Sequence, residues 1–417
     1  MKFEKIIIYH PSKYLGGTEI LFSRVIDVLL GASFKEIIVV DYNNGILSAN
    51  LKKNGVTYYN VRDVEWIKCV SSSLVLASAR NINRLFDTIG SVTNVHVFFW
   101  LLHPSELYSG YCIGSTGIKK KLGYPLLKSY LNLLPGFRMF SRNIEYLISH
   151  NNLWFMDESC KAESEWALDI KIASNTILPL VTNLEVNSAF NDCSEYHSDL
   201  TYKLLVISRL DDFKVYSIYK LLKDLKRLEQ ENRTFELHLI GDGEHRDSLI
   251  DECGKINNIK LVFHGYMQND MLNDFLTQNH FDLLFAMGTA ALEGASRGIP
   301  TVLLAATNSP IVNRNDVYKY IDRQKSISLG EYLDTPFENI NGMTLEDVIY
   351  LNDREHDILK KNVINFFTLN YSYNITRNNF LRTLESINCI NLERLETSFL
   401  SKIYIKFINM KRIRSGI

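Results

Sequence analysis

The sequence has few cysteines, and no two of them lie close together along the chain. Its 417 residues include six cysteines, which are scattered and form no Cys-x-x-Cys sequence. Scattered cysteines without such a pair argue against both a disulfide framework and a structural zinc site. We therefore expect reduced thiols, as in a cytoplasmic protein, and no metal site built on cysteine.

An excess of one charge and long apolar runs are also missing. Lys plus Arg number 46, against 47 Asp plus Glu, so no net positive charge attracts the chain to nucleic acid. No stretch approaches the ~20 apolar residues of a membrane-spanning helix, and the apolar run near the N-terminus is too short for a signal peptide. We expect a cytoplasmic protein that binds no nucleic acid.

The sequence does contain a repeated alternation of apolar strands and amphipathic helices. Continuous apolar runs are typical of strands buried in a parallel sheet. Strand candidates of this kind, in which most positions are apolar, lie at 5–9, 36–40, 95–100, 146–148, 204–208, 235–240, 260–264, 282–286 and 301–304, and an amphipathic helix is predicted at 216–229. One core stops growing at roughly 250–300 residues. The predicted fold class is therefore α/β, with two domains that each alternate strand and helix.

A polar stretch at 183–201 interrupts this alternation and is the predicted linker. The N-terminal Rossmann-like domain then covers residues 1–182, and the C-terminal Rossmann-like domain covers 202–370. Residues 371–417 are predicted to form a helix that returns to the N-terminal domain, followed by a basic tail.

Glycines and cations follow two of the predicted strands. Gly16 and Gly17 lie between the strand at 5–9 and a helix, and Arg209 and Lys214 follow the strand at 204–208. Ligands of open α/β sheets bind where the strands end. Backbone amides at a glycine loop, an Arg fork and a Lys ammonium all suit phosphate oxygens. A simple turn and a solvated pair of cations are the alternatives.

Several segments resemble, in order and spacing, the retaining GT-B glycosyltransferases of the family 4 type. In the C-terminal half these are VISRLDDFK, LIGDGEHRDSL, LVFHGY and FAMGTAALEGASRGIPTVLL; in the N-terminal half they are GGTE and WLLHPSEL. The MGTxxLEGAxxGIP motif and the FMDE sequence at 155–158 resemble those of transferases of bacterial capsule and surface-polysaccharide assembly. The likeness covers about residues 6–384, and it implies two Rossmann-like domains that face each other across a donor-binding cleft.

This resemblance implies a role for particular residues. Arg209 and Lys214 would contact the diphosphate of a nucleotide-sugar, and Glu293 would bind the ribose hydroxyls. His103 would lie close to the donor sugar, so His103 and Glu293 are the catalytic candidates. The other implied donor-binding residues are Gly16, Gly17, Glu19, Gly241, Tyr266, Met287, Gly288 and Thr289. A structural histidine and a helix-capping glutamate are the alternatives for His103 and Glu293.

The chain departs from the family pattern at one position. The commonest family form has a Glu, seven residues and a second Glu, and the first of these positions falls on Phe285. A carboxylate that would contact the transferring sugar is then missing. Backbone N–H groups at 287–289 could still donate hydrogen bonds there.

The resemblance implies transfer of a hexosyl or N-acetylhexosaminyl group from a nucleoside-diphosphate sugar, with retention, to a lipid-linked or surface-polysaccharide acceptor. No Asp-x-Asp sequence occurs, so we expect neither a metal nor another cofactor. A non-catalytic GT-B subunit, favoured by Phe285, and a nucleotide-sugar epimerase are the alternative functions. The donor base, the acceptor and the oligomeric state stay open.

Two basic segments could contact an anionic membrane surface. No acidic residue occurs from Leu107 to Ile144, and an apolar helical face is predicted within 118–142 between lysines and arginines. The alternative is a helix that packs on its own domain. The tail at 402–414 is basic as well, so the predicted location is cytoplasmic, with peripheral binding to the inner face of the plasma membrane.

Overall fold

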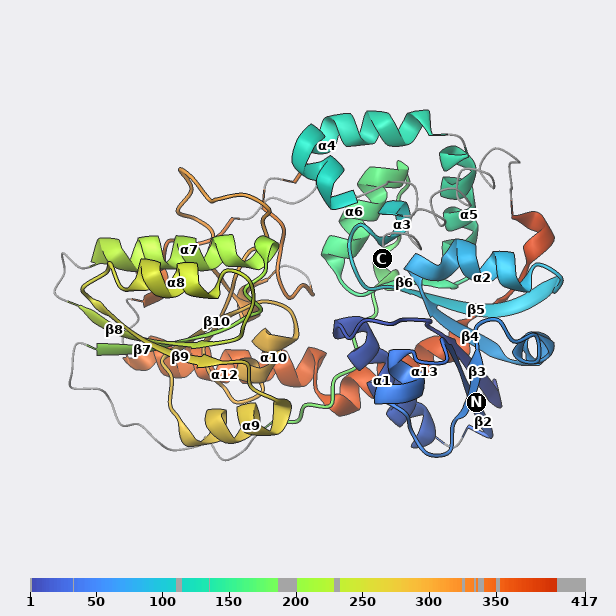
Figure 1. Ribbon diagram of the computed structural model, residues 1–417, viewed down its shortest axis with the longest axis horizontal. Coiled ribbons are helices and arrows are strands. Elements are labelled where there is room, and N and C mark those ends of the chain that lie inside the picture. Colours follow the sequence, from blue (N-terminus) through green and yellow to red (C-terminus); the bar gives the residue numbers. More distant parts are fainter. Residues whose placement is uncertain are drawn as a thin grey trace. The chain divides into compact units, whose positions relative to one another are not determined.

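The computed structural model describes residues 2–32, 34–109, 115–134, 136–186, 201–228, 233–324, 327–333, 335–336, 341–349 and 353–395. The chain divides into two compact units. Unit 1 comprises Met1–Asn183 and Tyr373–Ile417, and unit 2 comprises Leu184–Ser372. Each unit contains its own largely parallel sheet (Figure 1).

The sheet of unit 1 has the strand order β13-β5-β4-β1-β2-β3, with β6 paired to β5. Only β13 is antiparallel to its neighbour among these described strands. The strands are β1 Lys5–Tyr9, β2 Glu36–Asp41, β3 Thr57–Asn60, β4 Leu74–Ser78, β5 Asn94–Leu101, β6 Leu153–Phe155 and β13 Cys389–Asn391. The chain proceeds from β1 to β2 on one side and returns to β4 on the other. The strand order therefore reverses between β1 and β4, where α/β sheets bind ligands.

Helices cover both faces of this sheet (Figure 1). Their bounds are α1 Gly17–Leu30, α2 Ile82–Ile89, α3 Glu106–Ser109, α4 Ser115–Leu133, α5 Phe137–Ser149, α6 Glu158–Leu168 and α13 Tyr373–Ser386. Shorter helical turns lie at Ile46–Asn50, Trp66–Ser72, Ala79–Asn81, Ser174–Thr176 and Leu392–Arg394.

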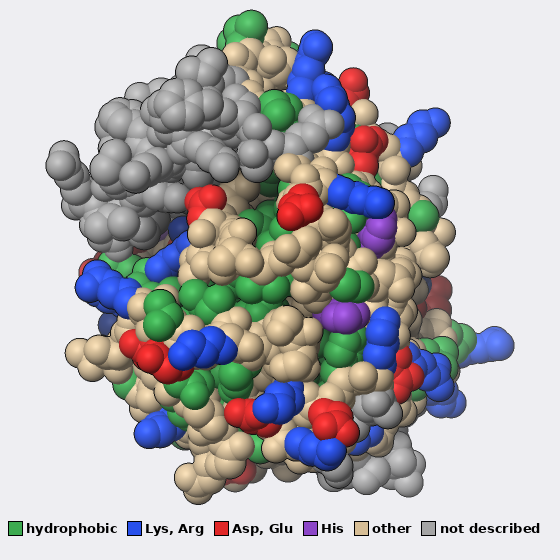
Figure 2. Space-filling model, turned by 90° about the vertical axis from the view of Figure 1, so that its right-hand side faces the viewer, with side chains coloured by type: hydrophobic (Ala, Val, Ile, Leu, Met, Phe, Trp, Pro, Cys, Tyr) green, Lys and Arg blue, Asp and Glu red, His purple; other side chains and the backbone are tan. Residues whose placement is uncertain are grey.

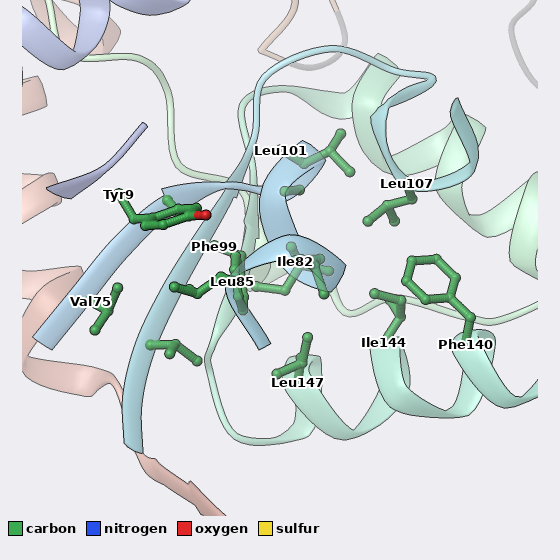
Figure 3. Packing of buried hydrophobic residues seen from close by; sticks show 14 of the residues in the cluster. Tyr9, Val75, Ile82, Leu85, Phe99, Leu101, Leu107, Phe140, Ile144 and Leu147 are labelled. Carbon is green, nitrogen blue, oxygen red and sulfur yellow. The ribbon is translucent and has the colours of Figure 1, made fainter. Parts of the chain in front are cut away.

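The strand predicted at 146–148 is wrong, because these residues belong to α5. Phe140, Ile144 and Leu147 are buried on one face of that helix and point toward the sheet that contains Phe99 (Figure 3). A short apolar run does not by itself distinguish a strand from a buried helix. Here the spacing of three and four residues across the longer segment is the helical one. Every other predicted strand is present, with bounds that differ by at most three residues.

The segment after residue 372 completes unit 1. On α13, the ring of Phe380 stacks on Trp100 at a centroid distance of 5.8 Å and meets Phe98 edge-on at 6.1 Å. Burial of an aromatic side chain of this size contributes about 2 kcal/mol. β13 then pairs with β5, so the last described strand belongs to the same sheet as the first.

Most of the apolar face predicted within 118–142 packs inside unit 1. Leu127 and Leu131 on α4 are fully buried, and Tyr130 and Leu134 pack against the same cluster. The packing alternative therefore accounts for these four side chains, while Leu126 and Leu133 are exposed. The side chains at 118–122 and the tail at 402–414 lie outside the described residues.

The sheet of unit 2 has the strand order β12-β11-β10-β7-β8-β9. Its strands are β7 Thr201–Ile207, β8 Thr234–Ile240, β9 Ile259–Gly265, β10 Leu283–Ala286, β11 Thr301–Leu303 and β12 Lys319–Tyr320. Its helices are α7 Asp212–Arg227, α8 Arg246–Cys253, α9 Asn269–Gln278, α10 Thr289–Ala295, α11 Leu345–Ile349 and α12 Asp353–Asn370. The strand order reverses between β7 and β10, so the loops that follow these two strands are the natural place for a ligand.

Charges of both signs are interspersed over the face that Figure 2 shows. This mixture agrees with the near balance of cationic and acidic residues in the sequence. Within the described part of the chain, no helix is both long enough and apolar enough to cross a membrane.

Candidate functional site

In unit 2, two cations lie where β7 ends. Arg209 has a side chain that is 67% exposed, and its Nη1 lies 3.3 Å from Asp211 Oδ2. Lys214 lies in the first turn of α7. Burial and the nearby charge of Arg209 lower the pKa of the Lys214 ammonium to about 8, although Asp211 acts in the opposite direction. An anion bound here would relieve the repulsion between the two cations.

Glycine is required in the loop after β8. Gly241 has φ +144°, and a Cβ there would lie 1.8 Å from the Ser208 carbonyl oxygen. Its N–H donates to the Gly265 carbonyl at 2.9 Å, so the ends of β8 and β9 are tied together. Gly241 therefore lets the loops after β7 and β8 approach closely. Tyr266, directly after β9, is 73% exposed.

Glu293 lies on α10, which follows β10, and its carboxylate is held by a residue that the sequence reasoning missed. Arg297 Nη1 donates to Glu293 Oε2 at 2.9 Å and to the Glu293 carbonyl at 2.7 Å. Arg297 is buried, while the Glu293 side chain is 20% exposed. A Glu and an Arg four residues apart on one helix are neighbours, and this spacing could have revealed the pair from the sequence. Oε1 has no protein partner among the described residues.

Phe285 does not lie where a missing carboxylate would matter. It belongs to β10, is fully buried, and meets the ring of Tyr318 edge-on at 6.1 Å. Only Met287 and Gly288 separate β10 from α10, so counting eight residues back from Glu293 reaches into the strand. The structure thus corrects the interpretation of Phe285 as a replaced sugar contact, because this position belongs to the core.

The backbone N–H groups at 287–289 were expected to donate to a ligand, but that of Gly288 already has a partner in the protein. It donates to the Leu329 carbonyl at 2.6 Å. Gly288 has φ +64° and precedes Thr289, the first residue of α10, while Met287 is buried. The prediction that all three amides are available for a ligand is therefore wrong for Gly288.

In unit 1, the glycine loop precedes α1. Gly16 is the N-cap residue and Gly17 is the first residue of the helix. Glu19 is buried, and its Oε1 lies 2.9 Å from His10 Nε2. Burial alone would raise the pKa of the Glu19 carboxyl, but the hydrogen bond and charge of His10 bring it below its ordinary value. The carboxylate that the sequence assigned to the donor is thus engaged with His10, which stacks on Phe22.

His103 lies two residues after the end of β5, and its side chain is exposed. Its Nδ1 lies 3.3 Å from the Ser105 amide nitrogen and 3.1 Å from Ser105 Oγ. Three residues further on, Glu106 Oε2 accepts from the Leu102 N–H at 2.9 Å. Burial raises the pKa of Glu106 to about 7, so this carboxyl can carry a proton near neutral pH. The sequence reasoning did not single it out, although WLLHPSEL contains it.

A second carboxyl with a raised pKa lies in the FMDE run. Asp157 caps α6 by accepting from the Cys160 N–H at 2.8 Å. Burial raises its pKa to about 6. Within the described part of the chain, no group of three or more His, Cys, Asp or Glu side chains is placed to hold a metal ion.

Comparisons with known proteins identify the fold. No protein-family model and no curated protein matches the sequence. Among solved structures, a glycosyltransferase from Rickettsia africae has a TM-score of 0.58 at 14% identity, over 93% of this chain and 98% of that one. A sucrose-phosphate synthase from Thermosynechococcus elongatus has a TM-score of 0.54 at 10% identity, over 91% and 98%. A UDP-forming α,α-trehalose-phosphate synthase from Burkholderia xenovorans has a TM-score of 0.53 at 12% identity, over 92% and 99%. The chain therefore has the GT-B fold.

Proposed function

We propose that the protein is a glycosyltransferase that moves a sugar from a nucleoside-diphosphate donor to a glycan acceptor. The observation that carries the proposal lies in unit 2, where Arg209 and Lys214 follow β7 and Glu293 follows β10, on the two sides of the strand-order reversal. The similar structures named above include a glycosyltransferase and a UDP-forming synthase, which supports this class of reaction.

The finer part of the proposal rests on the sequence resemblance. It comprises retention of configuration, a hexosyl or N-acetylhexosaminyl donor of the family 4 type, and a lipid-linked or surface-polysaccharide acceptor at the cytoplasmic side of the membrane. Breaking the bond between the anomeric carbon and the diphosphate leaves negative charge on the leaving group. Arg209 and Lys214 would stabilise that charge, and transfer would need no divalent cation.

Glu293 would bind the ribose of the donor. Its Oε2 accepts from buried Arg297, which fixes the carboxylate and leaves Oε1 for a ribose hydroxyl. In unit 1, His103 is the exposed candidate for contact with the sugar, and the loop at Gly16 and Gly17 is the candidate for contact with phosphate.

A non-catalytic subunit with the GT-B fold is the second candidate. The observation that favours it is that the segment 285–292 contains no carboxylate, so neither the end of β10 nor the loop after it supplies the first acid of the family pattern ahead of Glu293. Such a subunit could still bind a nucleotide, but it would not turn over a donor.

We expect one nucleoside diphosphate, among UDP, GDP and ADP, to raise the thermal unfolding temperature selectively, because a ligand of the native state stabilises it by mass action. The shift should persist in EDTA and should be largely lost in Glu293→Ala. Glu252→Ala, an exposed carboxylate on α8, is the matched control and should keep the full shift. If no nucleotide or nucleotide-sugar raises the unfolding temperature of the wild-type protein, the donor site is not where we place it. Binding without donor turnover would favour the non-catalytic subunit.

The affinity for the nucleotide should fall as the pH rises through about 8. Below that pH the Lys214 ammonium is charged and attracts the diphosphate, and above it the charge is lost. Since the terminal phosphate titrates near ~6, it stays ionised over this range. We expect Kd to rise about tenfold between pH 7 and pH 9. Isothermal titration of wild type and Lys214→Ala over this range tests the assignment, since the variant should show a flat profile; equal slopes would refute it.

A further inference from the structure

A second group of cations lines a cavity in unit 2, at a distance from the ends of β7 and β10. Lys220, Lys223 and Arg227 lie on one face of α7, at spacings of three and four residues. Arg314 reaches the same place from the segment that follows β11. Together they line a cavity of about 240 Å³.

The segment 304–318, here called the α7 strap, builds the other wall of this cavity. Near the start of α7, the Thr307 N–H donates to the Phe213 carbonyl at 3.0 Å. Further along, Asn315 Oδ1 accepts from Lys220 Nζ at 3.4 Å and from Arg227 Nη1 at 3.2 Å. The strap therefore follows α7 toward its last turn, and Figure 1 shows it in orange beside that helix.

The cavity is separate from the candidate donor site. Lys223 follows Lys214 by nine residues on α7, which corresponds to about 14 Å along the helix axis. An anion held at Lys214 therefore does not fill the cavity under the strap.

Two of the four cations, Lys220 and Arg227, are held in place before any ligand binds. Asp224 is buried and accepts hydrogen bonds from Lys220, from Arg227 at 3.3 Å and from the Tyr318 hydroxyl at 2.7 Å. Lys220 is itself only 5% exposed. Because these side chains are already fixed, a ligand would bind them with little further loss of conformational entropy.

Positive charge is in excess at this place. Four cations and no carboxylate are among the residues that line the cavity. Asp224 and Asp316 pair with these cations, with Asp316 Oδ1 3.3 Å from Arg314 Nε, and the charge of Glu346 acts on Tyr318 beside Asp224. Lys223 has no ion-pair partner among the described residues. Cations in the last turn of a helix favourably oppose its dipole, which explains Arg227 but neither Lys220 nor Arg314.

We propose that this cavity binds a phosphate or diphosphate group of a ligand other than the sugar donor. Its volume is below the roughly 300–1,000 Å³ of pockets for drug-sized ligands. Ile311 is the one apolar residue of the lining, so there is no aromatic surface to hold a nucleobase. Asn313 and Asn315 add amide groups beside the cations. The group is either a small soluble anion or the phosphate of a lipid headgroup.

Isothermal titration with inorganic pyrophosphate tests this site, with the full chain carrying Arg209→Ala and Lys214→Ala so that the candidate donor site is removed. We expect this double variant to retain one pyrophosphate site. In that background, Lys223→Gln and Arg314→Gln should each weaken binding by about tenfold. Lys226→Gln is the matched control, because Lys226 is an exposed cation of the same helix that does not line the cavity.

Co-sedimentation with phosphatidylcholine vesicles, with and without phosphatidic acid, identifies the source of the phosphate. Sedimentation that needs phosphatidic acid and is lost in Lys223→Gln indicates a lipid headgroup, while pyrophosphate binding alone indicates a soluble anion. The proposal is overturned if the double variant binds neither probe, or if binding persists unchanged in both Lys223→Gln and Arg314→Gln. Because the titration is done without the donor site, it stays informative even if the proposed transferase activity is absent.

Discussion

Replacing Lys214 with alanine is expected to lower kcat/KM for sugar transfer by about 100- to 1,000-fold, the effect of removing one donor that stabilises a leaving oxyanion. The Lys214 ammonium lies half-buried in the first turn of α7, where its charge is less screened than that of a surface lysine. Arg209→Ala should have a smaller effect, because the Arg209 side chain is largely exposed. The measurement is the initial rate with the nucleotide-sugar that the thermal-shift experiment selects.

Lys226→Ala is the control for Lys214→Ala, since it removes an exposed cation from the same helix. We expect its kcat/KM to stay within about twofold of the wild-type value. The double variant of Arg209 and Lys214 should lose less than the product of the single losses, because neighbouring cations interact with the same group. A wild-type rate in Lys214→Ala, with folding intact, would exclude a role in transfer.

Replacing Asp41 with alanine is expected to destabilise unit 1 by about 4 kcal/mol. Asp41, the last residue of β2, is fully buried. Its Oδ1 accepts from the N–H groups of Ser12 at 2.9 Å and Tyr42 at 2.7 Å, and its Oδ2 accepts from those of Leu47 at 3.0 Å and Ser48 at 3.1 Å. Each buried donor left without a partner costs about 1–3 kcal/mol, and water entering the space would satisfy some of them.

Tryptophan fluorescence during urea unfolding measures this loss, because all four tryptophans lie in unit 1, at positions 66, 100, 154 and 166. Asp27→Ala is the control, since Asp27 forms a half-exposed ion pair with Lys53 at 2.9 Å. We expect that variant to lose less than about 1 kcal/mol. Equal unfolding midpoints for Asp41→Ala and Asp27→Ala would show that the four hydrogen bonds do not hold the loops of unit 1.

Nucleotide binding should weaken in Asp41→Ala as well. Asp41 binds the Ser12 N–H, and the Ser12 carbonyl in turn accepts from the Ile46 N–H at 2.9 Å. The segment between β1 and the glycines at 16 and 17 is therefore held to the end of β2. Loss of this connection would release the glycine loop, even where unit 1 stays folded.

The sequence by itself determined the alternation of strands and helices. The runs at 6–9 and 204–207 are apolar at every position, which suits a strand buried on both faces whatever surrounds it. The glycines at the start of α1 and after β8 were likewise visible in the sequence, and after β8 the turn needs glycine, since Gly241 has φ +144°. The order of the motifs along the chain also allowed the fold class to be predicted, and it is confirmed.

Only the tertiary structure decided what lies beside each side chain. It assigned the run at 146–148 to a helix, turned Glu19 toward His10, and buried Phe285 in the core. It also brought Arg314 to the cations of α7. Backbone preference is a property of a few neighbouring residues, whereas burial, charge and hydrogen-bond partners depend on residues that are far apart in the chain. The type of fold could therefore be inferred locally, but which carboxylates and amides are available for a ligand could not.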